Sequence, residues 1–209
     1  MLLLFFSFSG DNFKKGQLKF ARVKSAYQEK WEGLKKLLKE KKTDTSSFEI
    51  YLRAFKYDKK LEVWVRDSKS FPKFSLLKTY NICAVSGDLG PKRREGDGQV
   101  PEGFYEIDNF NPTSNYHLSL HVNYPNFSDR YLSDKKHPGG DIMIHGNCVT
   151  IGCMPITDDC IKELYVLAVE TKNKGQKIAV DIFPCYFTEN NMAMLKKNYS
   201  ADLNAFWAE

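Results

Sequence analysis

The hydrophobic pattern of this chain changes from a helical to an alternating period, and that change limits the folds open to it. Between residues 18 and 42, apolar side chains recur every three or four positions, which is the spacing of one helix face. From residue 48 onward, apolar and polar side chains alternate in short runs, which is the pattern of strands with one buried face. We therefore expect an N-terminal amphipathic helix followed by a β-dominated core.

The alternating runs predict a sheet with several strands. Segments 48–55 and 61–67 flank the sequence KYDKK and together indicate a β-hairpin. Further strand candidates lie at 76–85, 103–107, 116–122, 141–144 and 177–183. A chain of 209 residues is long enough for one domain with a substantial core.

Two helices are predicted in the second half of the chain. Thr157 suits an N-cap, the two aspartates after it suit the first helical turn, and Ile156 and Ile161 occupy the positions of a hydrophobic staple. A final helix is predicted from Thr188 to the end of the chain, with Thr188 as its cap.

Positive charge is concentrated in the N-terminal helix. Residues 14–42 contain eleven Lys or Arg and three Glu, whereas the whole chain has a net charge of +5. Such a face suits nucleic acid, anionic lipid or an anionic wall polymer, although a basic helix face is more often simply solvated. The polar sequence KKTDTSS at 41–47 indicates a boundary between this helix and the main body of the chain.

The opening sequence MLLLFFSFSG contains an apolar run of the kind found in export signals, but it lacks a basic start and a clear cleavage site. No other run approaches the roughly 20 apolar residues that span a bilayer. We therefore divide the chain into a candidate export-signal remnant at 1–12, a basic amphipathic helix at 13–45 and a main domain at 46–209.

The segment GDIMIHGNCVTIGCMPITDD, at 140–159, carries the main chemical signal. His145 ends a predicted strand, and Cys153 lies in a loop shortly before the predicted helix. A cysteine attacks as its thiolate, and imidazole is well suited to accept its proton near neutral pH. Gly152 leaves room beside the sulfur, and backbone N–H groups from Gly152 to Met154 are candidate donors to an oxyanion.

Other interpretations of this segment stay open at this point. His145, Cys148, Cys153 and Cys160 have the composition of a zinc site, although their gaps match no familiar ligand spacing. On spacing alone, the preferred interpretation is that the cysteines are small buried hydrophobic residues and that the histidine is a satisfied strand end. Cys148 is also a rival nucleophile. The five cysteines are an odd number without a CxxC pair, so at least one thiol is expected to be free.

Several polar side chains elsewhere are candidate substrate contacts. Tyr105, Asn123 and Tyr124 lie in or beside predicted strands, and His121 shares one strand face with His117. The long glycine-rich stretch at 86–103 is typical of a functional or mobile loop, and its basic residues at 92–94 would either meet substrate carboxylates or form a solvated tip.

The sequence IMIHGNCVTIGCMPITDDCIKELY resembles the active-site segment of the L,D-transpeptidase (YkuD-type) catalytic domain family, and in particular its YafK-like branch. The stretches SGDLGPKRREGDGQVPEGFYEI and NYHLSLHVNYPNFSDR are also similar to that branch, so the resemblance covers about 48–183. Pro155 stands where many relatives carry Arg or Asn. Thr150 and Ile151 precede Gly152 where some relatives have Ser or Thr followed by His.

The resemblance implies an α+β fold, with a β-sandwich-like catalytic core, the N-terminal amphipathic helix and flanking helices. It implies Cys153 as nucleophile, His145 as proton acceptor and donor, and Gly152 beside the oxyanion. It also implies peptidoglycan stem peptides as substrate, no metal or other cofactor, a monomer, and a location in the periplasm or cell envelope.

Three functions are compatible with these features. The first is a transpeptidase that forms 3→3 cross-links through a thioester. The second uses the same nucleophile for hydrolysis, as a carboxypeptidase or endopeptidase or to release a wall-attached protein. The third is a non-catalytic wall-binding module anchored by the basic helix. Nucleic-acid binding has little support, because no stacking-aromatic sheet or recognised motif accompanies the basic residues.

Overall fold

The structure is a computed structural model that describes residues 11–69 and 73–208. The apolar opening segment at 1–10 lies outside the described residues, so the predicted export-signal remnant has no structural description. Over the part of the chain that is described, no helix is both long and apolar enough to cross a membrane.

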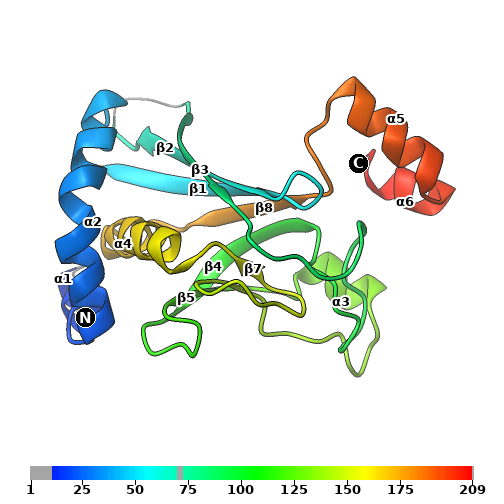
Figure 1. Ribbon diagram of the computed structural model, residues 1–209, viewed down its shortest axis with the longest axis horizontal. Coiled ribbons are helices and arrows are strands. Elements are labelled where there is room, and N and C mark those ends of the chain that lie inside the picture. The colour runs from blue at the N-terminus through cyan, green and yellow to red at the C-terminus, as the bar shows by residue number, and fades with distance from the viewer. Residues whose placement is uncertain (1–10, 70–72, 209) are drawn as a thin grey trace, which may run out of the picture.

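Within these residues, eight strands form one mixed sheet in the order β3-β2-β1-β8-β4-β5-β6-β7 (Figure 1). The pairs β1–β8 and β6–β7 are parallel, and the other pairs are antiparallel. The strands are β1 (Phe48–Phe55), β2 (Lys60–Asp67), β3 (Ser75–Asn81), β4 (Gly103–Asn111), β5 (Ser119–Val122), β6 (Met143–His145), β7 (Met154–Pro155) and β8 (Ala179–Phe183).

The helices lie before, between and after the strands. They are α1 (Asp11–Gln17), α2 (Ala21–Glu40), α3 (Phe127–Leu132), α4 (Asp158–Asn173), α5 (Glu189–Asn198) and α6 (Ala201–Phe206). The predicted fold class, an α+β protein with helices flanking a curled sheet, is therefore confirmed.

The predicted hairpin is confirmed, because Phe48 pairs with Asp67 and Phe55 with Lys60. The strands predicted at 76–85 and 116–122 are too long: β3 ends at Asn81, and His117 adopts a positive φ of 71° before β5 begins. The predicted N-terminal helix is broken into α1 and α2, and the final helix into α5 and α6. The short elements β7 and α3 were not predicted.

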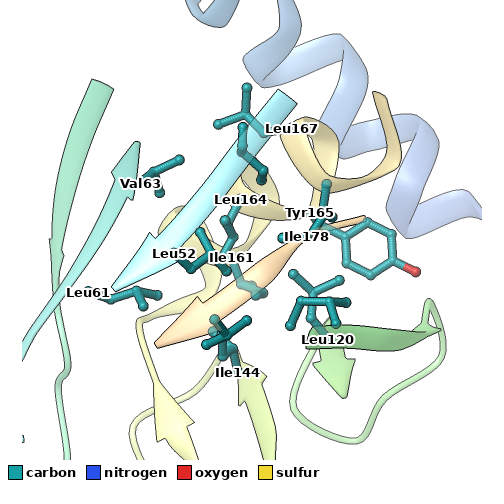
Figure 2. Close-up of a cluster of buried hydrophobic side chains, with 14 of the residues drawn as sticks. Leu52, Leu61, Val63, Leu120, Ile144, Ile161, Leu164, Tyr165, Leu167 and Ile178 are labelled. Atoms are coloured by element: carbon teal, nitrogen blue, oxygen red, sulfur yellow. The ribbon is translucent and has the colours of Figure 1, made fainter. Parts of the chain in front are cut away.

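The central core lies between α4 and the sheet. Figure 2 shows Ile161 and Leu164 of α4 facing Leu52, Leu120 and Ile144 of the strands, and all five side chains are fully buried. The predicted start of α4 is confirmed, since Thr157 Oγ1 accepts a hydrogen bond from the Cys160 N–H at 3.4 Å. The α4 helix is thus fixed at the end that lies next to Cys153.

The N-terminal helices pack against α4 on the side away from the C-terminal helices (Figure 1). The α2 residues Val23, Ala26, Leu34 and Leu38 are buried in the same hydrophobic core as the sheet. Polar contacts follow the same interface, because Lys162 of α4 forms a 2.7 Å ion pair with Glu29 of α2. The basic helix therefore contributes to the main core.

Buried ion pairs order the glycine-rich stretch at 86–103. Lys92 Nζ lies 2.5 Å from Asp97 Oδ1, and both side chains are largely buried. Lys56 Nζ lies 2.9 Å from Glu102 Oε1, and burial lowers the pKa of this lysine. Glu102 also accepts a 2.7 Å hydrogen bond from the indole of Trp207, just after α6. Lys92 was expected to contact substrate or to lie at a solvated loop tip, whereas in the structure it forms an internal ion pair.

Replacement of Leu38 by Ala tests whether α2 belongs to the core. Because this side chain is fully buried, we expect the variant to lower the free energy of unfolding by about 2–5 kcal/mol in a single transition. The exposed Lys36→Ala is the control on the same helix, expected to change it by less than about 0.5 kcal/mol. Chemical denaturation followed by circular dichroism measures both; a small effect or two separate transitions would contradict a shared core.

Candidate active site

His145 ends β6, and Cys153 immediately precedes β7, the strand that pairs with β6. Ile144 pairs with Met154, and His145 pairs with Pro155, in the parallel register of β6 and β7. Cys153 directly precedes Met154, so it lies opposite Met143. Because side chains alternate along strands, Cys153 and His145 share one sheet face, with Cα atoms roughly 8 Å apart from the strand spacing and the rise of two residues.

His145 is held in one orientation by its surroundings. Its Nδ1 contacts the carbonyl oxygen of Gly146, an arrangement that assigns the proton to Nδ1 and leaves Nε2 as the acceptor. The ring stacks against Tyr116, with centroids 4.7 Å apart. Burial lowers the pKa of His145 below its ordinary value of 6.5. The neutral imidazole is therefore the form present at pH 7.

Cys153 is a free and partly buried thiol. Its Sγ donates a 3.5 Å hydrogen bond to the carbonyl oxygen of Asp141. Burial raises the pKa of Cys153 above its ordinary value of 9.0, and the Asp141 carboxylate raises it further. The resting pair is thus an uncharged thiol and an uncharged imidazole.

The backbone before Cys153 is tightly folded around Thr150. Thr150 Oγ1 accepts the N–H of Gly152 at 3.2 Å and that of Cys153 at 2.7 Å, and it donates to the Cys153 carbonyl at 2.8 Å. Gly152 has a φ of +128°, and a Cβ there would lie 3.2 Å from the Gln99 carbonyl oxygen. The predicted oxyanion donors of Gly152 and Cys153 therefore point at the Thr150 hydroxyl in this structure.

The turn after His145 requires glycine. A Cβ at Gly146 would lie 2.5 Å from Asp158 Oδ1 and 2.8 Å from the Tyr116 carbonyl oxygen. The same Asp158 oxygen accepts the Asn147 N–H at 2.7 Å, so the first turn of α4 anchors the loop that begins after β6. Neither Tyr116 nor Thr150 was predicted as a site residue, and Asp158 was predicted only as a residue of the helix start.

A disulfide joins Cys148 to Cys83, 65 positions earlier in the chain, with Cα atoms 5.4 Å apart. Cys83 follows β3, and its N–H donates a hydrogen bond to the Pro155 carbonyl at 2.9 Å. The disulfide therefore links the loop that contains Cys148 to the segment after β3. Cys148 is therefore neither a free nucleophile nor a thiolate ligand, which removes the four-ligand zinc site considered for this segment. The odd cysteine count gave no indication of which cysteines pair.

The predicted substrate contacts occupy different environments. The Tyr105 hydroxyl donates to Asp129 at 2.9 Å, and that of Tyr124 donates to the Pro138 carbonyl at 3.0 Å, both from buried side chains. The Asn123 side chain accepts the Glu106 N–H at 2.8 Å. These three side chains make contacts within the fold.

His121 is placed differently from the other three. It pairs with Met143 across β5 and β6, and it therefore lies on the same sheet face as Cys153 and His145. It is half-buried, with Nδ1 2.5 Å from Asp108 Oδ1.

Cys153 lies at the edge of a hollow of about 300 Å³. Its wall includes Tyr57, Lys59 and Asp88 together with Tyr199, which follows α5. The Tyr199 hydroxyl donates to Asp88 at 2.8 Å, so the C-terminal helices form part of the wall. We call this space the thiol hollow. Polar and apolar side chains therefore line the hollow beside the free thiol.

Comparison with known proteins gives a consistent result. The L,D-transpeptidase catalytic domain (YkuD) matches residues 49–180. The chain is 33% identical over 174 residues to "Putative L,D-transpeptidase YafK" of Escherichia coli K12 and of Escherichia coli O157:H7, covering 82% of this chain and 67% of that protein.

Among solved structures, the fold is similar to the helical cell shape determining protein Pgp2 of Campylobacter jejuni, with a TM-score of 0.53 and 22% identity. That match covers 70% of this chain, which spans about half the length of the Pgp2 chain. The likeness supports the fold, while the domain match and the identity to YafK establish the relationship: the chain belongs to the L,D-transpeptidase catalytic domain family.

Proposed function

We propose that this protein is a cysteine-dependent peptidoglycan L,D-transpeptidase that remodels the cell wall through a thioester acyl-enzyme. One observation carries the proposal: the free thiol of Cys153 lies on the same sheet face as His145, whose Nδ1 is fixed by the Gly146 carbonyl. The substrate is a stem peptide whose amide bond, following a diamino acid, is exchanged or cleaved.

The chemistry starts from the uncharged pair. The thiol turns from the Asp141 carbonyl to His145, Nε2 takes its proton, and the sulfur attacks the carbonyl carbon of the amide. The tetrahedral intermediate collapses as the imidazolium gives that proton to the leaving amine, and a thioester remains. A second stem-peptide amine then forms a cross-link, or water hydrolyses the thioester.

The Thr150 hydroxyl prepares the site for the oxyanion. It holds the N–H groups of Gly152 and Cys153 side by side, and a developing oxyanion then replaces it as their acceptor. Of the predicted substrate contacts, His121 is the one that we retain, because it is half-buried on the same sheet face.

The disulfide supports an envelope location. Disulfides persist in oxidising compartments and are rare in the cytosol, so the Cys83–Cys148 bond favours an exported protein. An oxidising envelope is also the compartment in which the proposed wall substrate lies.

Intact-mass analysis after incubation with a carbapenem or a stem tetrapeptide tests the nucleophile. We expect one covalent adduct at Cys153, its loss in Cys153→Ala, and a rate reduced at least 100-fold in His145→Ala. Cys160→Ala is the control, because that thiol is also free and partly buried. An adduct at Cys160, or one that survives in Cys153→Ala, would refute the assignment. Muropeptide analysis after incubation with sacculi then distinguishes cross-linking from hydrolysis.

The neutral resting pair has a distinct pH signature. Because the pKa of Cys153 is raised above 9.0, about one per cent or less of this thiol is ionised at pH 7. Alkylation of Cys153 by iodoacetamide, measured against Cys153→Ala, should therefore keep accelerating beyond pH 9. Because the pKa of His145 is lowered below 6.5, kcat/KM should fall only as pH decreases below that value. Alkylation that is already rapid and constant between pH 5 and 8 would instead indicate a thiolate–imidazolium pair.

Substitution at Thr150 tests the role of its hydroxyl. Thr150→Val keeps the side-chain shape but removes three hydrogen bonds around Cys153, so we expect kcat to fall about tenfold or more. Thr150→Ser keeps the hydroxyl and should retain activity within about threefold. Acylation rates of the two folded variants give the comparison, and equal rates would show that the hydroxyl is dispensable.

A further inference from the structure

A second hollow, of about 330 Å³, is lined by residues of α3 and α6 among others. These two helices lie at the end of the molecule opposite α1 and α2 (Figure 1). Five of its thirteen lining residues are aromatic, and we call it the aromatic hollow. The aromatic side chains that line it are Phe104, Phe183, Phe187, Phe206 and Trp207.

Two of these rings are exposed and held in fixed orientations. Phe104 is 70% exposed and Phe187 is 54% exposed. Each packs edge-on against Phe183, with centroids 6.3 Å and 5.5 Å apart and interplanar angles of 82° and 76°. Exposed aromatic clusters of this kind mark binding surfaces in soluble proteins.

The hollow contains a buried carboxylate that makes only a long contact with its neighbouring cation. The Asp129 side chain is 4% exposed, and its Oδ2 accepts hydrogen bonds from the Tyr105 hydroxyl and the Asn126 N–H. Its Oδ1 faces the Arg93 guanidinium at 3.7 Å, which is longer than a direct hydrogen bond. Arg93 is itself positioned over the Phe206 ring. A ligand hydroxyl between them could donate to Oδ1 and accept from Arg93.

The aromatic hollow and the thiol hollow both share lining residues with a third hollow. Leu89 lines both the thiol hollow and an intermediate hollow of about 360 Å³, while Arg93 and Phe206 line both the intermediate and the aromatic hollow. The three hollows are therefore neighbours along the segment 199–207, which contributes lining residues to each of them. Such an arrangement suits a polymer better than an isolated small molecule.

These features select the ligand chemistry. A pyranose ring has an apolar C–H face that packs on an aromatic ring, and a rim of hydroxyls that bind planar carboxylate, guanidinium and amide groups. An apolar protein segment would use the phenylalanines but would offer no hydroxyl to bridge the 3.7 Å gap between Asp129 Oδ1 and the Arg93 guanidinium.

We propose that the aromatic hollow binds an N-acetylated sugar unit of the glycan strand to which the reacting stem peptide belongs. The identity of the polymer rests on the proposed function, whereas the binding itself requires no turnover. The hollow would thus hold the glycan while the peptide extends toward Cys153.

Binding is measured with the full chain carrying Cys153→Ala, using the tetramer of N-acetylglucosamine as a peptide-free probe and calorimetry or NMR titration. We expect saturable binding that weakens about five- to tenfold in Phe104→Ala, through the loss of one stacking face. Phe127→Ala is the matched control, since this phenylalanine on α3 is 87% exposed but does not line the hollow. Its binding should stay within twofold of the parent.

A second readout uses the active enzyme. Phe104→Ala should raise KM for intact sacculi while leaving the rate with a soluble stem peptide unchanged. Three results would each overturn the proposal. They are the absence of saturable binding up to about 10 mM tetramer, binding by Phe104→Ala as tight as by the parent, and displacement of the tetramer by an apolar peptide but not by further glycan. If Cys153 forms no acyl adduct but the tetramer still binds at Phe104, only the proposed function fails.

Discussion

Parallel pairing of β6 with β7 is the contact on which the candidate active site depends. Parallel neighbours are usually joined by a dozen or more residues, whereas here only residues 146–153 connect them. Ile144 and Met154 are paired and point into the core with almost no exposed surface. Their burial forces the intervening chain outward, and the alternation of side chains then turns His145 and Cys153 to the opposite face. The core thus sets the orientation of the reactive groups.

The segment after β7 is strained, and polar contacts hold both it and the short connection in place. Thr157 has a φ of 70° and a ψ of 157°, a conformation nearly restricted to glycine, which costs about 1–3 kcal/mol. It persists because the Thr157 hydroxyl caps α4 and because the adjacent Ile156 N–H donates to the His145 carbonyl at 2.9 Å. The disulfide of Cys148 fixes the outer part of the loop. Residues at both ends of the loop are therefore ordered, and the two candidate catalytic residues beside it, His145 and Cys153, are uncharged.

The parts of the fold that sequence could predict are those with local signals. Alternation over 48–67 and the cap at Thr157 each occupy a few adjacent residues, and both are observed. The strand β7 has two residues and no periodicity, and the Cys83–Cys148 pair depends on chain segments 65 positions apart, so neither has a local signature. A signal for Thr150 does exist, because a threonine two or three residues before a tight turn commonly accepts its N–H groups.

The stretch at 86–103 shows how composition alone misleads. Its glycines and charges are typical of a mobile loop, yet Lys92 and Lys56 are buried against Asp97 and Glu102. Breaking one such pair leaves an uncompensated buried charge and costs about 3–5 kcal/mol, so charge pairing here replaces the apolar packing that the loop lacks. Lys56 lines the thiol hollow and Glu102 the aromatic hollow, so a single ion pair fixes the positions of both walls. The charges that suggested a solvated loop are the reason that it is ordered.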